Sequence, residues 1–140
     1  IDPPPPVEPY HAGDLPGSIR IACASNSGEL LDGHFGSCSR FLVYQVSATD
    51  CRLIDCRPVA SGPATETDKN THRTELIADC QCLYVVSIGG PAAAKVVRRG
   101  IHPIKIPTGG PAREQALALQ PILADHPPPW LRKAMGAVLD

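Results

Sequence analysis

This 140-residue chain has few aromatic side chains, no long apolar run and no marked excess of either charge. No run approaches the roughly 20 apolar residues that a membrane-spanning helix needs, so we expect no membrane contact. Lys and Arg total 13 against 14 Asp and Glu, and this balance offers no basic surface for nucleic acid or anionic lipid. The N-terminus is rich in proline and lacks the pattern of a secretory signal.

The six cysteines do not form the pattern of a disulfide framework. Cys23 lies inside an apolar run, and Cys80 and Cys82 flank the start of another, where free cysteines behave as small hydrophobic residues. Without a secretory signal, this pattern predicts reduced thiols and a cytoplasmic protein. Cys51 and Cys56 are an odd number of residues apart on a predicted hairpin, so we expect them on opposite faces and without function.

Proline divides the chain into two parts. Residues 1–17 include the run Pro3–Pro6, which favours an extended polyproline conformation and acts as a semi-rigid spacer. We therefore expect a linker over residues 1–17 that follows an upstream domain. Residues 18–140 are long enough to bury one hydrophobic core and are expected to form a core domain.

Apolar runs and turn residues divide the core domain into strands and helices. Its second half alternates strand and helix, which predicts parallel strands joined by right-handed crossovers, whereas its first half predicts an antiparallel hairpin. The order indicates an α/β fold with a mixed five-stranded sheet flanked by helices. The predicted strands cover 19–25, 41–47, 52–59, 83–88 and 101–106, the helices 71–79, 92–99, 112–123 and a short one within 127–135, and the main loops 26–38 and 61–70.

The loop after the first predicted strand contains a histidine, His34, in the run Asp-Gly-His-Phe-Gly. Glycine frees the backbone there, and an imidazole can face a proton, a metal or a bound cluster. Two later junctions, 88–91 and 107–111, each place a Gly-Gly-Pro turn between a strand and a helix, where backbone N–H groups attract anions. Ligands in such sheets bind beyond the carboxyl ends of strands, so we expect the three loops to form one pocket. The alternative is that these are ordinary turns and His34 is a solvated loop residue.

Other side chains are weaker candidates. Cys38 is either a second soft ligand or a small packed residue. Its spacing to His34, Cys80 and Cys82 matches no zinc motif. Three cations could add positive charge to the pocket or lie solvated on the surface. These cations are Arg40, Lys95 and Arg113.

Motifs of catalysis are missing. The chain has no Gly-x-Ser-x-Gly elbow, no phosphate-binding P-loop and no His-Glu-x-x-His. A metal-dependent hydrolase needs clustered carboxylates, and Glu29, Asp32 and Asp55 are the one plausible set. We therefore expect a protein that is not an enzyme, with the hydrolase as the alternative from another class.

Five short motifs are spread over the core domain: Ile-Ala-Cys-Ala-Ser at 21–25, Leu-Asp-Gly-His-Phe-Gly at 31–36, Phe-Leu-Val-Tyr at 41–44, Ile-Ala-Asp-Cys at 77–80 leading into 83–90, and Gly-Ile-His-Pro-Ile at 100–104. Together these motifs resemble the nitrogenase iron-molybdenum cofactor biosynthesis domain family. The resemblance extends over residues 18–123 and implies a ribonuclease H-like fold in a protein that is not a nuclease. It implies a carrier that binds the iron-molybdenum cofactor, or its iron-sulfur precursor, as cargo and meets apo-dinitrogenase and other assembly proteins.

The resemblance also implies a site. The family's cofactor-binding histidine corresponds to His34, which we expect to ligate a metal of the cluster. No cysteine ligand carries over, so Cys38 remains a candidate from its position alone. The full predicted binding set is Gly33, His34, Phe35, Gly36, Cys38, Gly89, Gly90, Gly109 and Gly110.

Overall fold

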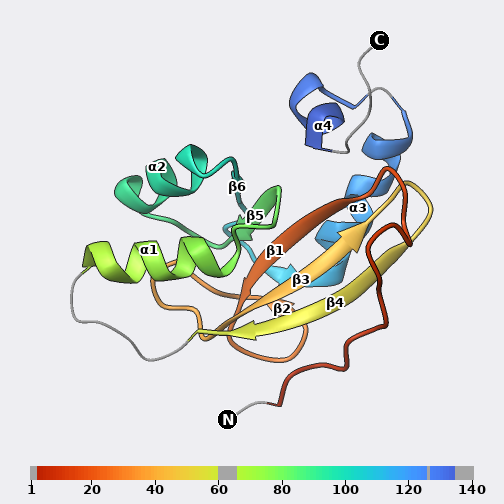
Figure 1. Ribbon diagram of the computed structural model, residues 1–140. Coiled ribbons are helices and arrows are strands. Elements are labelled where there is room, and N and C mark those ends of the chain that lie inside the picture. The colour runs from red at the N-terminus through yellow and green to blue at the C-terminus, as the bar shows by residue number, and fades with distance from the viewer. Residues whose placement is uncertain (1–2, 60–65, 126, 135–140) are drawn as a thin grey trace.

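A computed structural model of the protein describes residues 3–59, 66–125 and 127–134 (Figure 1). Within them the main sheet has five strands in the order β4-β3-β1-β5-β6. β1 pairs antiparallel with β3 and parallel with β5, β3 pairs antiparallel with β4, and β5 pairs parallel with β6. The predicted mixed five-stranded sheet is confirmed, and its ribonuclease H-like character stays a prediction. The strands are β1 (Ile19–Ser25), β3 (Arg40–Val46), β4 (Cys51–Pro58), β5 (Cys82–Val85) and β6 (His102–Lys105).

Helices cover both faces of this sheet. α1 (Glu66–Leu76) and α2 (Gly90–Arg98) lie on one face, and α3 (Ala112–Ala124) lies on the other (Figure 1). Because neighbouring strand residues point to opposite faces, the continuous apolar runs of the central strands supply two cores. One core packs against α1 and α2 and the other against α3. α4 (Pro129–Ala134) adds Leu131 to the second core.

The first helix differs from its prediction. α1 begins at Glu66 and ends at Leu76, whereas the sequence predicted a helix over 71–79 after a loop over 61–70. Its residues before Thr71 are polar and show no apolar periodicity, so the sequence contains no signal that the helix begins at Glu66. Its buried face includes Asn70 and Thr74, and the Thr74 hydroxyl donates to the Asn70 carbonyl at 2.7 Å. The predicted loop residues 61–65 lie outside the described part of the chain, as does Met135 of the predicted last helix.

Two very short strands form a second sheet that the sequence did not predict. β2 (Leu30–Leu31) lies within the predicted loop 26–38 and pairs antiparallel with β7 (Gly110–Pro111). Strands of two residues show no alternating pattern, so sequence analysis treated both as loop. The pairing ties the loop after β1 to the start of α3.

A bulge in β4 corrects the prediction for Cys51 and Cys56. The register with β3 shifts between Val43 and Tyr44, so one extra residue of β4 enters the pairing. This extra residue reverses the alternation, and both cysteines pack against the core under α3. The expectation of opposite faces was therefore wrong.

Part of the predicted linker packs on the core. The Glu8 N–H donates to the Leu53 carbonyl at 2.7 Å, and the Glu8 carboxylate accepts from the Leu53 N–H at 2.9 Å. The Arg20 guanidinium lies 5.9 Å from the centre of the Tyr10 ring. The spacer role of residues 1–17 stays a prediction. In the described residues, no helix has both the length and the apolar character to cross a bilayer.

Candidate functional site

The exposed side chain of His34 lies just past the carboxyl end of β5. His34 forms a parallel bridge with Ser87, where the chain has left β5. The Phe35 N–H donates to the Ser87 carbonyl at 3.0 Å, and the Val86 N–H donates to the Gly33 carbonyl at 2.9 Å. The His34 Nδ1 atom is 2.5 Å from the Ser87 hydroxyl oxygen, so one edge of the ring faces β5 and Nε2 lies on the other edge. The backbone therefore fixes the position of the imidazole.

The two glycines beside His34 differ in what they do. The Gly33 N–H donates to the Ala24 carbonyl at 3.1 Å, so the loop folds back onto the end of β1. A Cβ atom on Gly33 would lie 2.7 Å from the Cys38 Cβ and 2.9 Å from the Ala24 carbonyl carbon. At Gly36 an added Cβ meets no heavy atom within 4 Å. Packing therefore demands glycine at 33 but not at 36.

Phe35 and Cys38 point into the protein. Both side chains are buried, and the Phe35 ring lies 6.0 Å from the ring of Phe41 in the core under α1 and α2. Burial raises the pKa of the Cys38 thiol to about 11, against the opposing effect of Arg73. Phe35 thus anchors the loop, and the Cys38 sulfur is not presented on the surface that carries His34. The structure gives no support to Cys38 as a second ligand.

Arg73 of α1 holds the loop from inside, a role that sequence analysis missed. Its Nη1 donates to the Phe35 carbonyl at 3.0 Å and to the Cys38 carbonyl at 2.8 Å. The same atom lies 3.2 Å from the Cys38 sulfur. The turn itself is closed by the Ser37 and Cys38 N–H groups, which donate to the His34 carbonyl. No spacing in the sequence links Arg73 to this turn, because the contact joins residues more than 30 positions apart.

A second network fixes the entry to the loop. The Asp32 carboxylate accepts from the Asn26 N–H and from the Ser27 hydroxyl, both at 2.6 Å. The Asn26 side-chain oxygen accepts from the Ser39 N–H at 3.0 Å. Asp32 therefore shapes the segment between β1 and His34.

The third loop meets the first one at Gly109. Its φ of +60° is a left-handed conformation that favours glycine, and an added Cβ would lie 2.5 Å from the Leu31 carbonyl oxygen. The Ala112 N–H donates to the Glu29 carbonyl at 3.0 Å. Because the loop after β5 also bonds to Gly33, the three loops lie next to one another, and the pocket predicted between them stays a prediction.

The remaining glycines lie at the starts of helices. Gly89 is the N-terminal cap of α2, Gly90 begins that helix, and Gly110 begins β7 just before α3. An added Cβ on any of the three would meet no heavy atom within 4 Å, so close packing does not require glycine there. α2 begins three residues after Ser87, the residue whose hydroxyl contacts the His34 ring. A ligand-binding role for these glycines stays a prediction.

The three predicted cations have partners within the protein. Arg40 donates to the Gly28 carbonyl at 2.8 Å, and Lys95 donates to the Thr71 hydroxyl at 2.8 Å. Arg113 donates to the Glu29 carboxylate at 2.8 Å and lies over the Tyr44 ring. Each of the three side chains therefore links two segments of the protein.

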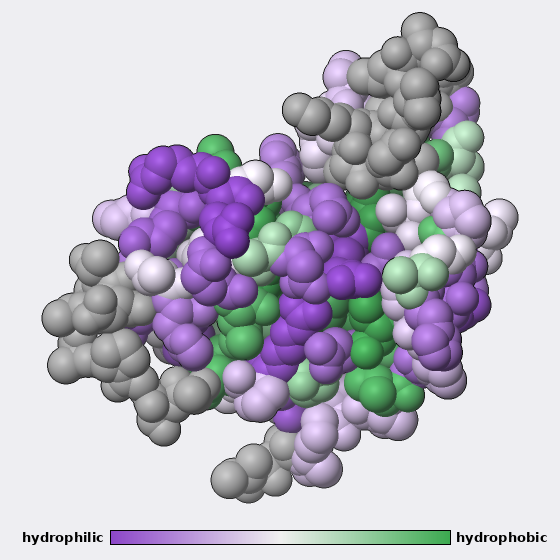
Figure 2. Space-filling view, in the orientation of Figure 1, coloured by the Kyte–Doolittle hydropathy of each residue, from purple (hydrophilic) through white to green (hydrophobic). Residues whose placement is uncertain are grey.

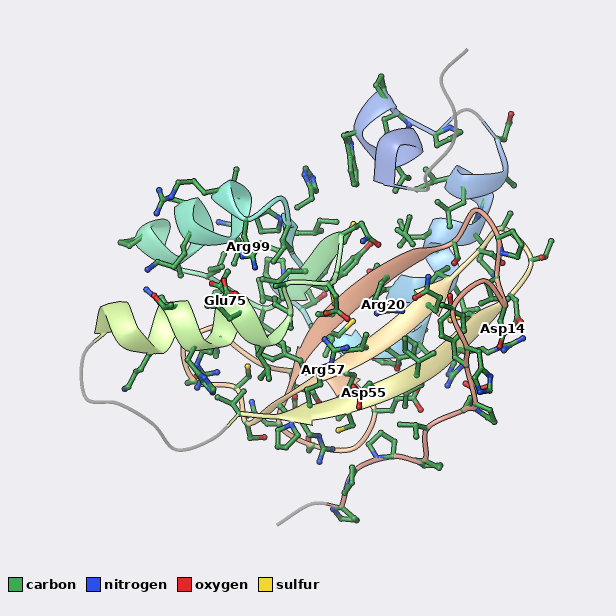
Figure 3. All side chains as sticks on the ribbon, in the orientation of Figure 1. Asp14, Arg20, Asp55, Arg57, Glu75 and Arg99 are labelled. Carbon is green, nitrogen blue, oxygen red and sulfur yellow. The ribbon has the colours of Figure 1, made fainter. Side chains whose placement is uncertain are left out.

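The carboxylates that a hydrolase would need have separate partners. Glu29 accepts from the Tyr44 hydroxyl at 2.6 Å, while Asp32 bonds within its own loop. Asp55 lies on β4 and pairs with Arg57 at 2.9 Å (Figure 3). In the described ranges, no group of three or more His, Cys, Asp or Glu residues could hold a metal ion. The predicted carboxylate set is therefore not assembled.

A hollow of about 300 Å³ lies between α1 and α2 and does not include His34. Arg99 and Glu75 face each other there, with two hydrogen bonds of 2.7 and 3.0 Å (Figure 3). On the face shown in Figure 2, most of the surface over these two helices is hydrophilic. The lining residues are Thr71, Thr74, Glu75, Lys95, Arg98 and Arg99.

Known proteins share both the sequence and the fold. The chain is 56% identical to NifY of Azotobacter vinelandii over 140 residues, which cover 99% of this chain and 57% of that protein. It is 36% identical to NifX of Rhodobacter capsulatus, covering 93% of this chain and 86% of NifX. NifY of Klebsiella pneumoniae is 36% identical, covering 90% of this chain and 60% of NifY. The chain thus spans less than two thirds of both NifY relatives.

A solved structure agrees with the fold. A crystal structure of a protein named for dinitrogenase, from Methanocaldococcus jannaschii, superposes with a TM-score of 0.52. It covers 76% of this chain and 91% of its own, at 8% identity, and so supports the α/β fold alone. The sequence model of the family described as dinitrogenase iron-molybdenum cofactor matches residues 17–121. Because that match covers most of the chain and the NifY and NifX relatives align along nearly all of it, the protein belongs to the dinitrogenase iron-molybdenum cofactor family.

Proposed function

We propose that this protein takes part in the biosynthesis or delivery of the iron-molybdenum cofactor of nitrogenase. The description of the family names that cofactor. A more distant relative, 26% identical over 90 residues, is the FeMo cofactor biosynthesis protein NifB of Bradyrhizobium diazoefficiens. More specifically, we propose a non-catalytic cytoplasmic carrier that binds the cofactor as cargo at His34 and hands it to apo-dinitrogenase.

The observation that supports this proposal is the exposed imidazole of His34, fixed in position by the loop and by Ser87. Imidazole is a good ligand for iron and other transition metals. The start of α2, three residues after Ser87, would provide backbone N–H groups and partial positive charge for an anionic part of the cargo. A single side-chain ligand, in place of a closed cage, leaves open coordination positions through which the cargo can be transferred.

The experiment is an anaerobic titration of the protein with isolated iron-molybdenum cofactor. We expect His34→Ala to fold normally and to bind at least about 10-fold more weakly, because it loses the metal-binding nitrogen. His11→Ala is the matched control, since His11 is an exposed histidine on the N-terminal segment. Equal affinity in His34→Ala and the wild type would refute His34 as the ligand.

The iron-sulfur precursor of the cofactor is a second candidate cargo for the same residues. The same imidazole and N–H groups would serve either cluster, so the site geometry favours neither. Titration of wild type and His34→Ala with both clusters separates the two. Tighter His34-dependent binding of the precursor would assign the protein to an earlier step of assembly.

The hydrolase alternative has its own test. Magnesium-dependent cleavage of an RNA–DNA hybrid by the wild type, lost in Asp32→Asn, would support it and contradict a carrier. We expect no such cleavage, because Glu29, Asp32 and Asp55 bond to different partners.

A further inference from the structure

We propose that Ser87 is a positioning residue for His34, and that its hydroxyl oxygen accepts the Nδ1 proton of the imidazole. This arrangement leaves Nε2 deprotonated and makes it the nitrogen that binds a metal of the cargo. The inference rests on the proposed function in naming that cargo. The hydrogen bond itself is a property of the chain alone.

The contact is short and both of its ends are fixed. Nδ1 and the Ser87 hydroxyl oxygen are 2.5 Å apart although both residues are exposed. Two backbone hydrogen bonds flank the contact, from Phe35 to Ser87 and from Val86 to Gly33. Surface hydrogen bonds between mobile side chains compete poorly with water, whereas here the two backbones already lie side by side. The entropy cost of bringing the two residues together is therefore already met by the backbone, and only the rotamer freedom of the two side chains is lost in forming the bond.

The chemistry of a metal-bound imidazole requires such a partner. A neutral imidazole has one protonated nitrogen and one with a lone pair, and the hydrogen bond at the first decides which atom is available to a metal. A histidine that ligates a metal usually donates its other N–H to a neighbouring acceptor, which fixes the ring and raises its basicity. A serine hydroxyl can accept this proton. Because Ser87 occupies Nδ1, Nε2 is the ligand atom.

The first test needs no cargo. We propose ¹⁵N NMR of the imidazole at about pH 8.5, where an ordinary histidine side chain is neutral. The wild type should show His34 protonated at Nδ1. Ser87→Ala should shift the population toward the Nε2-protonated form that a free side chain favours, and Ser87→Thr, which keeps the hydroxyl, should restore the wild-type tautomer. An unchanged tautomer in Ser87→Ala would overturn the inference.

The second test measures binding of isolated iron-molybdenum cofactor. Loss of such a partner typically weakens metal binding about 10- to 100-fold, so Ser87→Ala should fall in this range and Ser87→Thr should bind like the wild type. Ser37→Ala is the matched control, because Ser37 is an exposed serine of the same loop. A changed tautomer with wild-type affinity would contradict the positioning role. If His34→Ala binds like the wild type, both this inference and the proposed site fail, whereas a defect confined to His34→Ala contradicts Ser87 alone.

Discussion

His34 stands apart from two other exposed histidines in how its ring is held. The His11 ring lies 3.8 Å from the Asp14 carboxylate on the N-terminal segment. The face of the His102 ring is stacked on Trp130, with ring centres 4.1 Å apart. His34 instead meets a neutral hydroxyl at one ring edge. A hydroxyl orients the imidazole through one hydrogen bond, and a metal ligand must be unprotonated at the binding nitrogen.

Gly33 gives a prediction about the loop that carries His34. Gly33→Ala should lower the free energy of unfolding by about 1–3 kcal/mol, because its Cβ would overlap the Cys38 Cβ and the Ala24 carbonyl. Gly36→Ala is the control, since nothing lies within 4 Å of its added Cβ. Urea unfolding of the two variants measures the difference. Equal stabilities would mean that the loop does not lie against the end of β1.

Asp79 gives a prediction about pH. Its carboxylate accepts hydrogen bonds from Arg57 at 2.6 and 2.9 Å and from Arg20 at 2.7 Å, and these bonds hold its pKa well below the usual range. A lowered pKa in the folded state stabilises the protein above the unfolded value of about 3.9, and this contribution is lost as the pH falls through the folded value. Asp79→Asn should therefore lower the free energy of unfolding at about pH 7. The loss should be smaller at about pH 2.

The measurement for Asp79 is urea unfolding of wild type and Asp79→Asn across this pH range. Because the Asp79 side chain is 43% exposed, solvent screening keeps the effect modest. Asp14→Asn is the control, as Asp14 is similarly exposed and lies 3.5 Å from Arg52. A difference between wild type and Asp79→Asn that grows as the pH falls would contradict the assigned hydrogen bonds.

At the scale of elements, α1 supports the His34 loop through the side chain of Arg73. Arg73→Met keeps an apolar stem and removes the donor to the Phe35 and Cys38 carbonyls. We expect a loss of about 1–3 kcal/mol in the free energy of unfolding, because a charged donor to two largely buried carbonyls is removed. Amide hydrogen exchange at Ser37 and Cys38 should also become faster.

The control for Arg73 is Arg98→Met, which removes an exposed cation from the end of α2. Hydrogen exchange in the loop should be unchanged in that variant. Slow exchange at Ser37 and Cys38 in Arg73→Met would show that backbone bonds to β1 and to the segment after β5 hold the loop without help from α1.

The elements that sequence analysis predicted well are those with an internal pattern. β1 matches its predicted bounds, and β3 and β5 are fully buried as their apolar runs indicate. The pairing of β2 with β7 and the bulge in β4 depend on contacts between distant segments, and no local pattern encodes them. The site follows the same division. The glycines around His34 marked the loop, whereas its supports, Arg73 and Ser87, reach it across the fold.

At the scale of the whole molecule, ionic contacts join the N-terminal segment to the loop that carries His34. Arg113 donates to the Glu8 carboxylate at 3.3 Å and to the Glu29 carboxylate at 2.8 Å. Glu29 directly precedes β2, which begins the approach to His34. The N-terminal segment therefore contacts the residues that lead into the His34 loop. Docking of this segment should stabilise the core, which a free spacer would not do.

Removal of the N-terminal segment tests this coupling. A chain that begins at Ser18 loses both hydrogen bonds between Glu8 and Leu53 and the ion pair to Arg113. With about 0.5–1.5 kcal/mol for each hydrogen bond and less for a surface ion pair, we expect stability to fall by roughly 1–3 kcal/mol. A chain that begins at Val7 keeps these contacts and should unfold like the full chain. Equal melting temperatures for all three would identify residues 7–17 as a spacer, whereas a selective loss in the Ser18 chain would make them part of the folded core.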